Sequence, residues 1–332
     1  MMAISRIHIP RRVLIFTICL VAIVVILFLL ELVGISTKEV ANGALFVMTP
    51  LTLAAVGECI NEKAGLVNIG LEGIFLLTAI FGVYGAVHLG SGLAGLLVGS
   101  LVGALIGFIF GIISVYGRAN QIVAGMGINV FGGGMLLFIM MTLWHATSYE
   151  VRPEFMISKI STPLGLLSPI IFVAIAIAIL LHFILHRTFL GIKIRAAGEK
   201  PEAVDVGGKR VDHIRMFTCI LGGALAGLGG AFFSLGWLGT VVKDISAGRG
   251  FIALACVVFA GLEPLLALAA AFIFGFAESL AFTVMSLPAA HSFPFLAYFL
   301  KMVPYIVPLV VVSIFVGRRA FPKASGKPYI RE

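Results

Sequence analysis

Four polar side chains beside or within apolar stretches have the types and the spacing of a ligand-binding site: Asn68, Glu72, Gln121 and Asn129. Asn68 and Glu72 are four residues apart, so on a continuous helix they would share a face. Gln121 and Asn129 fall along one face of a later helix, at the start of another apolar segment. Together, amide and carboxylate groups donate and accept hydrogen bonds to a neutral ligand rich in hydroxyl or N–H groups. Because polar groups inside a bilayer are costly, we predict that these residues line a translocation path.

A purely structural interpretation exists for each of these residues. Hydrogen bonds between helices would explain Gln121 and Asn129 equally well. The charged residues that precede the first pair, Glu58, Glu62 and Lys63, are expected in a turn at the lipid headgroups rather than in a site. The glycines that flank the first pair argue against a continuous rigid helix there, and broken helices with exposed polar groups are how many transporters build their sites.

A second stretch with recognisable chemistry is the basic loop of residues 187–215, the longest polar run in the chain. Within it, Pro201–Val206 is predicted to form a short helix, because proline suits the first helical position and two glycines follow. So short a helix is not stable alone in water and must dock on another surface. The cations of this loop are Arg187, Lys193, Arg195, Lys200, Lys209, Arg210 and Arg215.

Composition places the rest of the chain in a membrane. Hydrophobic residues make up 61% of the 332 residues and charged residues 11%, with a mean hydropathy of +1.15. Soluble domains carry about 25% charged residues. We therefore predict an all-α, polytopic transmembrane helix bundle in the plasma membrane, formed by one transmembrane domain over residues 1–332. The net charge of +8 follows membrane orientation and does not indicate nucleic-acid binding.

Apolar segments long enough to span predict about ten crossings. The segment 251–285 is too long for one crossing, and Glu263-Pro264 interrupts it, so we divide it into a short arm and a full span. The short arm is a candidate re-entrant segment, because it is too short to span comfortably. The predicted segments are residues 13–33, 40–60, 67–89, 93–116, 122–143, 169–185, 216–237, 251–262, 265–285 and 295–316.

Positive charges orient these spans. With both termini and the basic loop placed in the cytoplasm, and residues 144–168 outside, all but six of the 23 Lys and Arg residues fall inside. The six are Lys38, Arg152, Lys159, Lys243, Arg249 and Lys301. Glu278 and Lys301 are candidate partners for an ion pair between helices. Glycines at every fourth position from Gly95 to Gly111 predict a groove for close helix packing, within this chain or against a second subunit.

Several kinds of chemistry have no signature in the sequence. There is no phosphate-binding Gly-x-x-x-x-Gly-Lys-Ser/Thr and no Gly-x-Ser-x-Gly, which disfavours an enzyme and indicates that any energy comes from another subunit. The four cysteines form no metal or disulfide pattern. His182 and His186 have the spacing of two metal ligands, but without a third ligand nearby in the sequence they are better explained as the end of a helix.

The segment Arg195 to Gly207 resembles the cytoplasmic coupling segment of ABC importer permeases, in the branch that carries simple sugars, nucleosides and branched-chain amino acids. Its form Arg-Ala-Ala-Gly-Glu-Lys-Pro-Glu-Ala looks most like the nucleoside and simple-sugar permeases. The stretches Glu62 to Gly73 and Gly248 to Ala255 are similar to two further motifs of that subgroup.

This resemblance implies an importer for nucleosides or simple sugars in which a separate ATPase subunit binds ATP and this chain carries no cofactor. It also implies a second permease subunit, identical or homologous, and an extracytoplasmic substrate-binding protein. The residues expected to dock in the ATPase are Pro201, Glu202, Ala203, Asp205 and Gly207.

Two other functions remain open from the residues. Branched-chain amino acid import is the alternative within the family. A stand-alone secondary transporter or channel is the alternative outside it, and would be expected to have coupling-ion carboxylates deep in the bundle and no docking loop.

Overall fold

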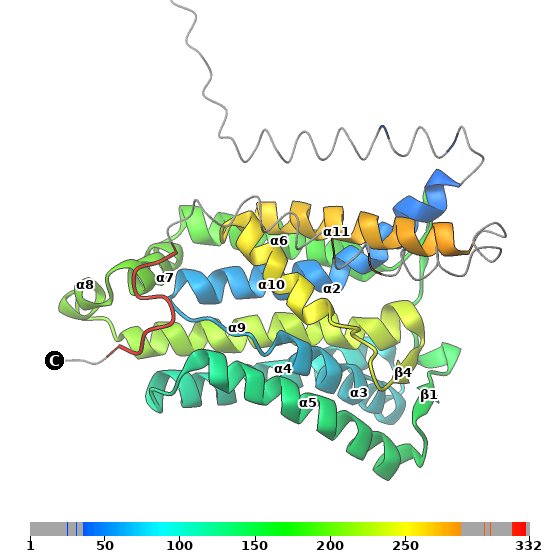
Figure 1. The fold of residues 1–332 in the computed structure, drawn as a ribbon, viewed down its shortest axis with the longest axis horizontal. Helices are drawn as coiled ribbons and strands as arrows, with labels where there is room; N and C mark the ends of the chain where they lie inside the picture. Colours follow the sequence, from blue (N-terminus) through cyan, green and yellow to red (C-terminus); the bar gives the residue numbers. More distant parts are fainter. Residues whose placement is uncertain are drawn as a thin grey trace, which may run out of the picture.

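The computed structural model describes residues 36–286 and 321–329, together with the single residues Val25, Glu31, Met302 and Ile306. Within these residues the chain is mostly helical, and its long helices run side by side (Figure 1). The predicted spans 13–33 and 295–316, Lys301 and both extreme termini lie outside the described residues.

Seven helices of the described part are long and apolar enough to cross a membrane, and an eighth, α10, is shorter. All eight coincide with predicted segments. π-helical turns extend two of them, as η1 (Ile112–Tyr116) after α4 and η3 (Phe233–Leu238) after α9. The helices are α2 (Thr37–Lys63), α3 (Leu71–Leu89), α4 (Gly92–Gly111), α5 (Gln121–Trp144), α6 (Pro169–Arg187), α9 (Val211–Phe232), α10 (Arg249–Ala260) and α11 (Pro264–Met285).

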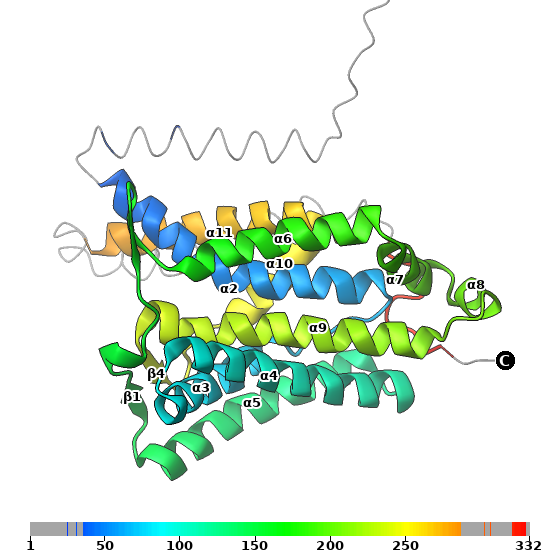
Figure 2. The ribbon, with the colours of Figure 1, turned by 180° about the vertical axis from the view of Figure 1, so that it is seen from behind.

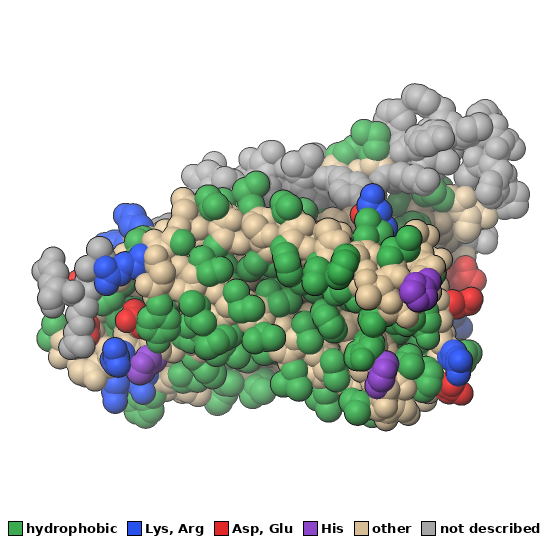
Figure 3. Space-filling model, turned by 90° about the horizontal axis from the view of Figure 1, so that it is seen from below, with side chains coloured by type: hydrophobic (Ala, Val, Ile, Leu, Met, Phe, Trp, Pro, Cys, Tyr) green, Lys and Arg blue, Asp and Glu red, His purple; other side chains and the backbone are tan. Residues whose placement is uncertain are grey.

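The outer surface supports a membrane location. In Figure 3 a broad apolar band covers the middle of the bundle, and charged side chains gather toward its two ends. Leu97, Leu101 and Leu105 of α4 belong to the apolar surface, each more than half exposed. Exposed leucines at this density are stable in lipid, whereas in water they would form a large unfavourable patch.

Two helices form the centre of the bundle. α2 is the most buried span, and it packs against both α9 and α11 (Figure 2). α9 packs most closely against α4, where the predicted glycine groove meets small residues. A Cβ added at Gly103 would collide with the carbonyl oxygen of Gly223, and one added at Gly223 would collide with that of Gly103. The groove therefore serves packing inside this chain.

The two ends of the bundle differ. At one end, called the basic end below, lie the C-terminus of α2 at Lys63 and the helices of the basic loop (Figure 1). At the opposite end lie four short strands and a 3-10 turn that an all-α prediction did not include. All of them except β4 lie within the polar residues 144–168, which lack the apolar periodicity of a helix. They are β1 (Ser148–Glu150), η2 (Pro153–Phe155), β2 (Ile160–Thr162), β3 (Gly165–Leu167) and β4 (Thr240–Val242).

The strands tie distant segments together at this end. β1 pairs antiparallel with β4, with Tyr149 opposite Val241, and β2 pairs with β3 as a hairpin. Asn42, near the start of α2, donates hydrogen bonds from Nδ2 to the carbonyls of Leu164 and Leu166, at 3.1 and 3.4 Å. The hairpin is thereby attached to the central helix.

The basic loop contains more helix than predicted. α8 (Pro201–Val206) has the predicted bounds, but α7 (Phe189–Glu199) precedes it and α9 already begins at Val211. α7 starts where the Thr188 hydroxyl accepts a hydrogen bond from the N–H of Gly191, at 3.2 Å. This threonine N-cap is a local signal that the sequence analysis overlooked.

The bundle contains two interruptions. Residues 64–70, between α2 and α3, are not helical, so α3 begins four residues after the predicted span does. The second interruption is the non-helical stretch 243–248 that precedes α10. α10 has only 12 residues and is separated from α11 by the turn that ends at Glu263, where the sequence predicted a division. These two interruptions meet inside the bundle, and they position the candidate site.

Candidate functional site

The non-helical segment 64–70 is held by two side chains of α5. The N–H of Val67 donates to Gln121 Oε1 at 2.8 Å. Two turns further along α5, Asn129 donates from Nδ2 to the carbonyl of Ile69 at 2.9 Å and accepts from the N–H of Gly73 at 2.8 Å. At 1.5 Å per residue, these contacts extend about 12 Å along α5 from its start. Gln121 and Asn129 thus share a face, as predicted, and that face supports the interruption.

Glu58 binds the same segment from the opposite side. Its Oε1 accepts from the N–H of Asn68 at 2.6 Å, and its Oε2 accepts from Asn61 Nδ2 at 2.9 Å. The prediction of a headgroup turn for Glu58 and Glu62 is wrong, because both lie on α2 and are buried, at 0% and 3% exposure. The returning segment supplies the donors that a buried carboxylate needs.

Asn68 does not lie on the helix that carries Glu72. It precedes α3, and its Oδ1 accepts from the N–H of Gly70 at 2.9 Å, so the predicted shared helix face is not formed. Asn68 is 1% exposed. The glycines around this pair, which argued against a continuous helix, correctly predicted the break before α3.

Glu72 joins the two interruptions. Its Oε1 accepts from the hydroxyl of Ser246 at 2.5 Å and from the N–H of Gly248 at 2.9 Å, and its Oε2 accepts from the N–H of Gly250 at 2.7 Å. These donors belong to the first turn of α10 and the residues before it. A carboxylate is stabilised there because the first N–H groups of a helix have no partners within it and carry partial positive charge.

Two buried amide nitrogens beside this junction have no hydrogen-bond partner among the described residues: Asn68 Nδ2 and Gln121 Nε2. Buried polar groups are usually paired, because an unmade hydrogen bond is costly. Both nitrogens are donors, and could bind the hydroxyl or carbonyl oxygens of a ligand. The four predicted path residues therefore surround one junction, where the segment 64–70 meets the start of α10. Glu72, Asn129, Asn68 Oδ1 and Gln121 Oε1 already make hydrogen bonds to the backbone there.

A buried ion pair lies beside this junction, at the first residue of α10. Arg249, the first residue of α10, bonds through its guanidinium to Glu278 of α11 and lies 5.0 Å from the ring centroid of Trp237. The sequence analysis placed Arg249 outside the bilayer and considered Lys301 for Glu278. The only sequence signal for a buried Arg249 was the pair of glycines on either side of it, which allow another segment of backbone to approach closely.

At the basic end, Arg215 is a buried cation, 2% exposed, that the sequence analysis counted as part of the loop. Its guanidinium donates to three carbonyls, those of Ala64 at 3.1 Å, Lys327 at 3.1 Å and Ala197 at 3.5 Å. It thereby joins the end of α2, the helix α7 and the segment 321–329.

α8 is attached to this base by one face. Val204 packs with Ala197 and Val211 in a small apolar cluster, and Asp205 Oδ2 accepts from the Tyr329 hydroxyl at 3.3 Å. The other face, with Glu202, Ala203, Val206 and Gly207, is exposed, and Val206 is 91% exposed.

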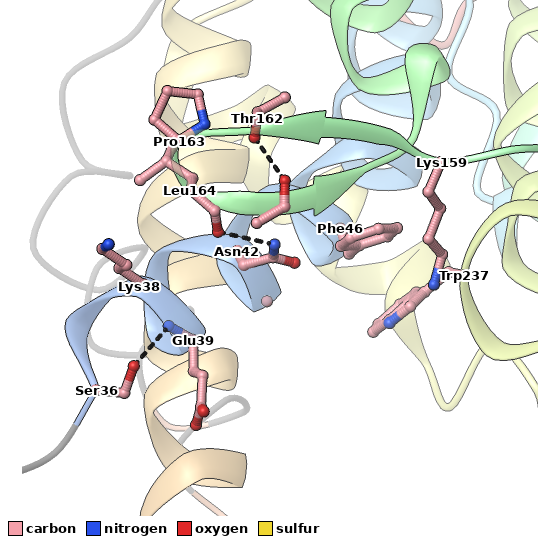
Figure 4. Close-up of a pocket in the computed structure, with 12 residues that line it drawn as sticks. Ser36, Lys38, Glu39, Asn42, Phe46, Lys159, Thr162, Pro163, Leu164 and Trp237 are labelled. Carbon is pink, nitrogen blue, oxygen red and sulfur yellow. Dashed lines mark hydrogen bonds between the residues drawn. The ribbon is translucent and has the colours of Figure 1, made fainter.

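A pocket of about 680 Å³ opens at the opposite end, between the start of α2 and the β2–β3 hairpin (Figure 4). The rings of Phe46 and Trp237 lie on one side of it, and Asn42 and the hairpin on the other. Lys159 Nζ lies 5.3 Å from the ring centroid of Phe46. Aromatic rings with a few polar groups suit a small ligand that has a flat or apolar body and hydrogen-bonding edges.

Comparison with known proteins gives the family. Residues 40–312 match the family described as "Branched-chain amino acid transport system / permease component". No solved structure matches the chain significantly.

Three curated relatives are informative. The chain is 34% identical to the guanosine ABC transporter permease protein of Bacillus subtilis (strain 168), over 88% of this chain and 96% of the relative. It is 32% identical to the nucleoside ABC transporter permease protein of Lactococcus lactis subsp. cremoris, over the same shares. A glucose ABC transporter permease protein of Haloferax volcanii is 26% identical over 62% of this chain and 59% of the relative.

A permease of an ABC transporter is the membrane component of a larger machine. ATP is bound by a separate ATPase subunit, so the permease carries no cofactor of its own, and importers of this type also use a substrate-binding protein. The helices of the described part and the match over residues 40–312 agree with that role. This chain therefore belongs to the branched-chain amino acid transport system permease component family, and it is a membrane-embedded, non-enzymatic permease subunit of an ABC importer.

Proposed function

We propose that this chain is the permease of an importer for nucleosides, with simple sugars as the second candidate class. The observation that carries this proposal is the similarity to a guanosine and a nucleoside permease over 88% of the chain. Branched-chain amino acids, which the family description names, are the third class. The unpaired amide donors of the candidate path are compatible with the hydroxyl and ring acceptors of a nucleoside or a sugar.

The path of the proposed importer passes the junction of the two interruptions. Asn68 and Gln121 would offer their unpaired Nδ2 and Nε2 donors to the passing ligand. Glu72 and Asn129 would hold the backbone that shapes the path, since their atoms are already bonded to Gly248, Gly250, Ile69 and Gly73.

The substrate class can be tested by competition. In cells that express the complete transporter, unlabelled nucleosides are expected to suppress uptake of labelled guanosine, because they occupy the same path. Glucose and leucine at the same concentrations should have little effect. Suppression by glucose would assign the sugar class instead, and suppression by leucine alone would contradict both leading classes.

The basic end faces the cytoplasm in this proposal, and the chain forms a single permease domain over residues 1–332 with both termini inside. The exposed face of α8 docks in the ATPase, through Glu202, Ala203 and Gly207, while Pro201 and Asp205 hold the helix against its base. A second permease subunit, identical or homologous, completes the path, and the binding protein delivers substrate at the strand-bearing end. Support comes from the exposure of α8 and from the cations that precede it.

Ala203→Asp is expected to uncouple the transporter without unfolding the permease. Ala203 is exposed, so the free permease loses no contact, but in the complex a new charge would be buried at a close contact, at a cost of a few kcal/mol. Pull-down in detergent should then recover much less ATPase, and substrate-stimulated ATP hydrolysis should fall. Ala203→Ser, which adds a hydroxyl and no charge, is the matched control. Wild-type recovery of the ATPase with Ala203→Asp would show that α8 is not the coupling element.

A further inference from the structure

Three side chains that are far apart in the sequence meet at the basic end of the bundle. His182 and His186 lie on the last turns of α6, and Glu263 lies at the start of α11. One ligand atom from each of the three lies within 4.8 Å of the other two. The two histidines alone were no metal site for lack of a third ligand, and the fold supplies that ligand from a residue 77 positions further along the chain.

The hydrogen bonds of His186 require a proton or a metal ion between its Nε2 and the carboxylate of Glu263. Its Nδ1 lies 3.0 Å from the carbonyl oxygen of His182, so Nδ1 carries the proton and donates. In the neutral ring, Nε2 is then an acceptor, and it lies 3.0 Å from Glu263 Oε2, which is also an acceptor. Two acceptors at this distance repel each other unless a proton or a metal ion lies between them.

His182 distinguishes these two cases. Its Nδ1 is buried and has no hydrogen-bond partner among the described residues, yet it lies 4.0 Å from the same Glu263 oxygen. A proton between His186 and Glu263 would leave this nitrogen unused. A metal ion would use all three atoms. Zinc binds nitrogen and oxygen ligands at about 2.0–2.2 Å, which places neighbouring ligands of a tetrahedral site about 3.4 Å apart. The observed separations of 3.0 and 4.0 Å lie on either side of that value.

We propose that His182 Nδ1, His186 Nε2 and Glu263 Oε2 form a site for Zn²⁺ or a similar transition-metal ion, with one coordination position left for water. A backbone carbonyl that accepts the other N–H of a histidine is a common support for metal ligands, and His186 has this support. The side chains are 24–35% exposed, so the ion can enter from solvent.

Lys63 tunes this site. Its Nζ lies 2.8 Å from Glu263 Oε1, the carboxylate oxygen that does not face the histidines. The lysine thus orients the carboxylate, but its charge repels a metal cation. The ion would connect the end of α6, which leads into α7 and α8, to the turn between α10 and α11. Metal binding would therefore stiffen the base of the exposed helix α8.

Zinc binding to the purified full-length chain, with its affinity tag removed, tests the proposal. Calorimetry should detect one Zn²⁺ per chain in the wild type, and Zn²⁺ should raise the melting temperature, because a ligand that binds only the folded state stabilises it. The double variant His182→Ala/His186→Ala should lose at least about tenfold in affinity and show no thermal shift. Co²⁺ should give a visible absorption band with the wild type alone.

Two further variants keep the test decisive if the double variant folds poorly. Glu263→Gln should weaken Zn²⁺ binding, since it removes the anionic ligand but little volume, and Lys63→Met should strengthen it. The matched control is His88→Ala/His213→Ala, which removes two exposed histidines elsewhere and should bind as the wild type does. Absence of saturable Zn²⁺ binding in the wild type would overturn the proposal and leave a protonated His186. Equal binding by wild type and double variant would do the same.

Discussion

Arg215→Met is expected to destabilise the basic end of the permease more than any other single change considered for this chain. The variant would leave the carbonyls of Ala64, Ala197 and Lys327 without their shared donor in a site that is 2% exposed. An unpaired buried polar group costs about 1–3 kcal/mol, so a loss of about 3 kcal/mol or more is expected. The melting temperature in detergent should fall by at least about 5 °C.

Two variants separate this effect from a simple loss of charge. Arg210→Met removes an exposed cation from the same loop and should leave the melting temperature unchanged. Arg215→Lys keeps the charge but cannot reach three carbonyls with one ammonium group, so an intermediate value is expected. If Arg215→Met melts at the wild-type temperature, Arg215 does not hold α2, α7 and the segment 321–329 together.

Glu72→Gln is expected to reduce substrate uptake by about tenfold or more while the protein still assembles in the membrane. The carboxylate accepts from Ser246, Gly248 and Gly250, and the amide of glutamine would turn one of its two oxygens into a donor that faces N–H or O–H groups. Hydrogen bonds to a charged group contribute about 1.5–3 kcal/mol, and 1.4 kcal/mol corresponds to a factor of ten in an equilibrium. The start of α10 would then lose its fixed position at the junction.

The measurement is uptake of labelled substrate at equal amounts of permease in the membrane, with ATPase recovery as the readout of assembly. Glu150→Gln, at the exposed end of β1, is the matched control and should transport normally. Wild-type uptake by Glu72→Gln would mean that the junction of the two interruptions is not part of the path. A loss of ATPase recovery would mean that Glu72 acts mainly on folding.

Sequence alone determined the features that depend on neighbouring residues. The apolar segments located the eight described bundle helices, because a bilayer demands long apolar runs. Pro201 and the glycines after Val206 fixed the bounds of α8, and Glu263-Pro264 fixed the division between α10 and α11. The four-residue spacing of glycines in α4 predicted its close packing, since each turn presents one glycine to the same neighbour. The motifs in three short stretches, residues 62–73, 195–207 and 248–255, indicated the family that the comparisons confirmed.

Only the tertiary structure decided how the charged residues are paired. Glu72 meets the N–H of Gly248, 176 residues away, and Glu263 meets Lys63, 200 residues away. Hydropathy and periodicity report on a residue's own segment, so they cannot identify a partner that another helix brings into contact. The sequence analysis therefore placed Glu58 and Arg215 at the surface, where unpaired charges are stable. Both are buried because the fold surrounds each of them with hydrogen-bond partners, and this offsets the cost of removing the charge from water.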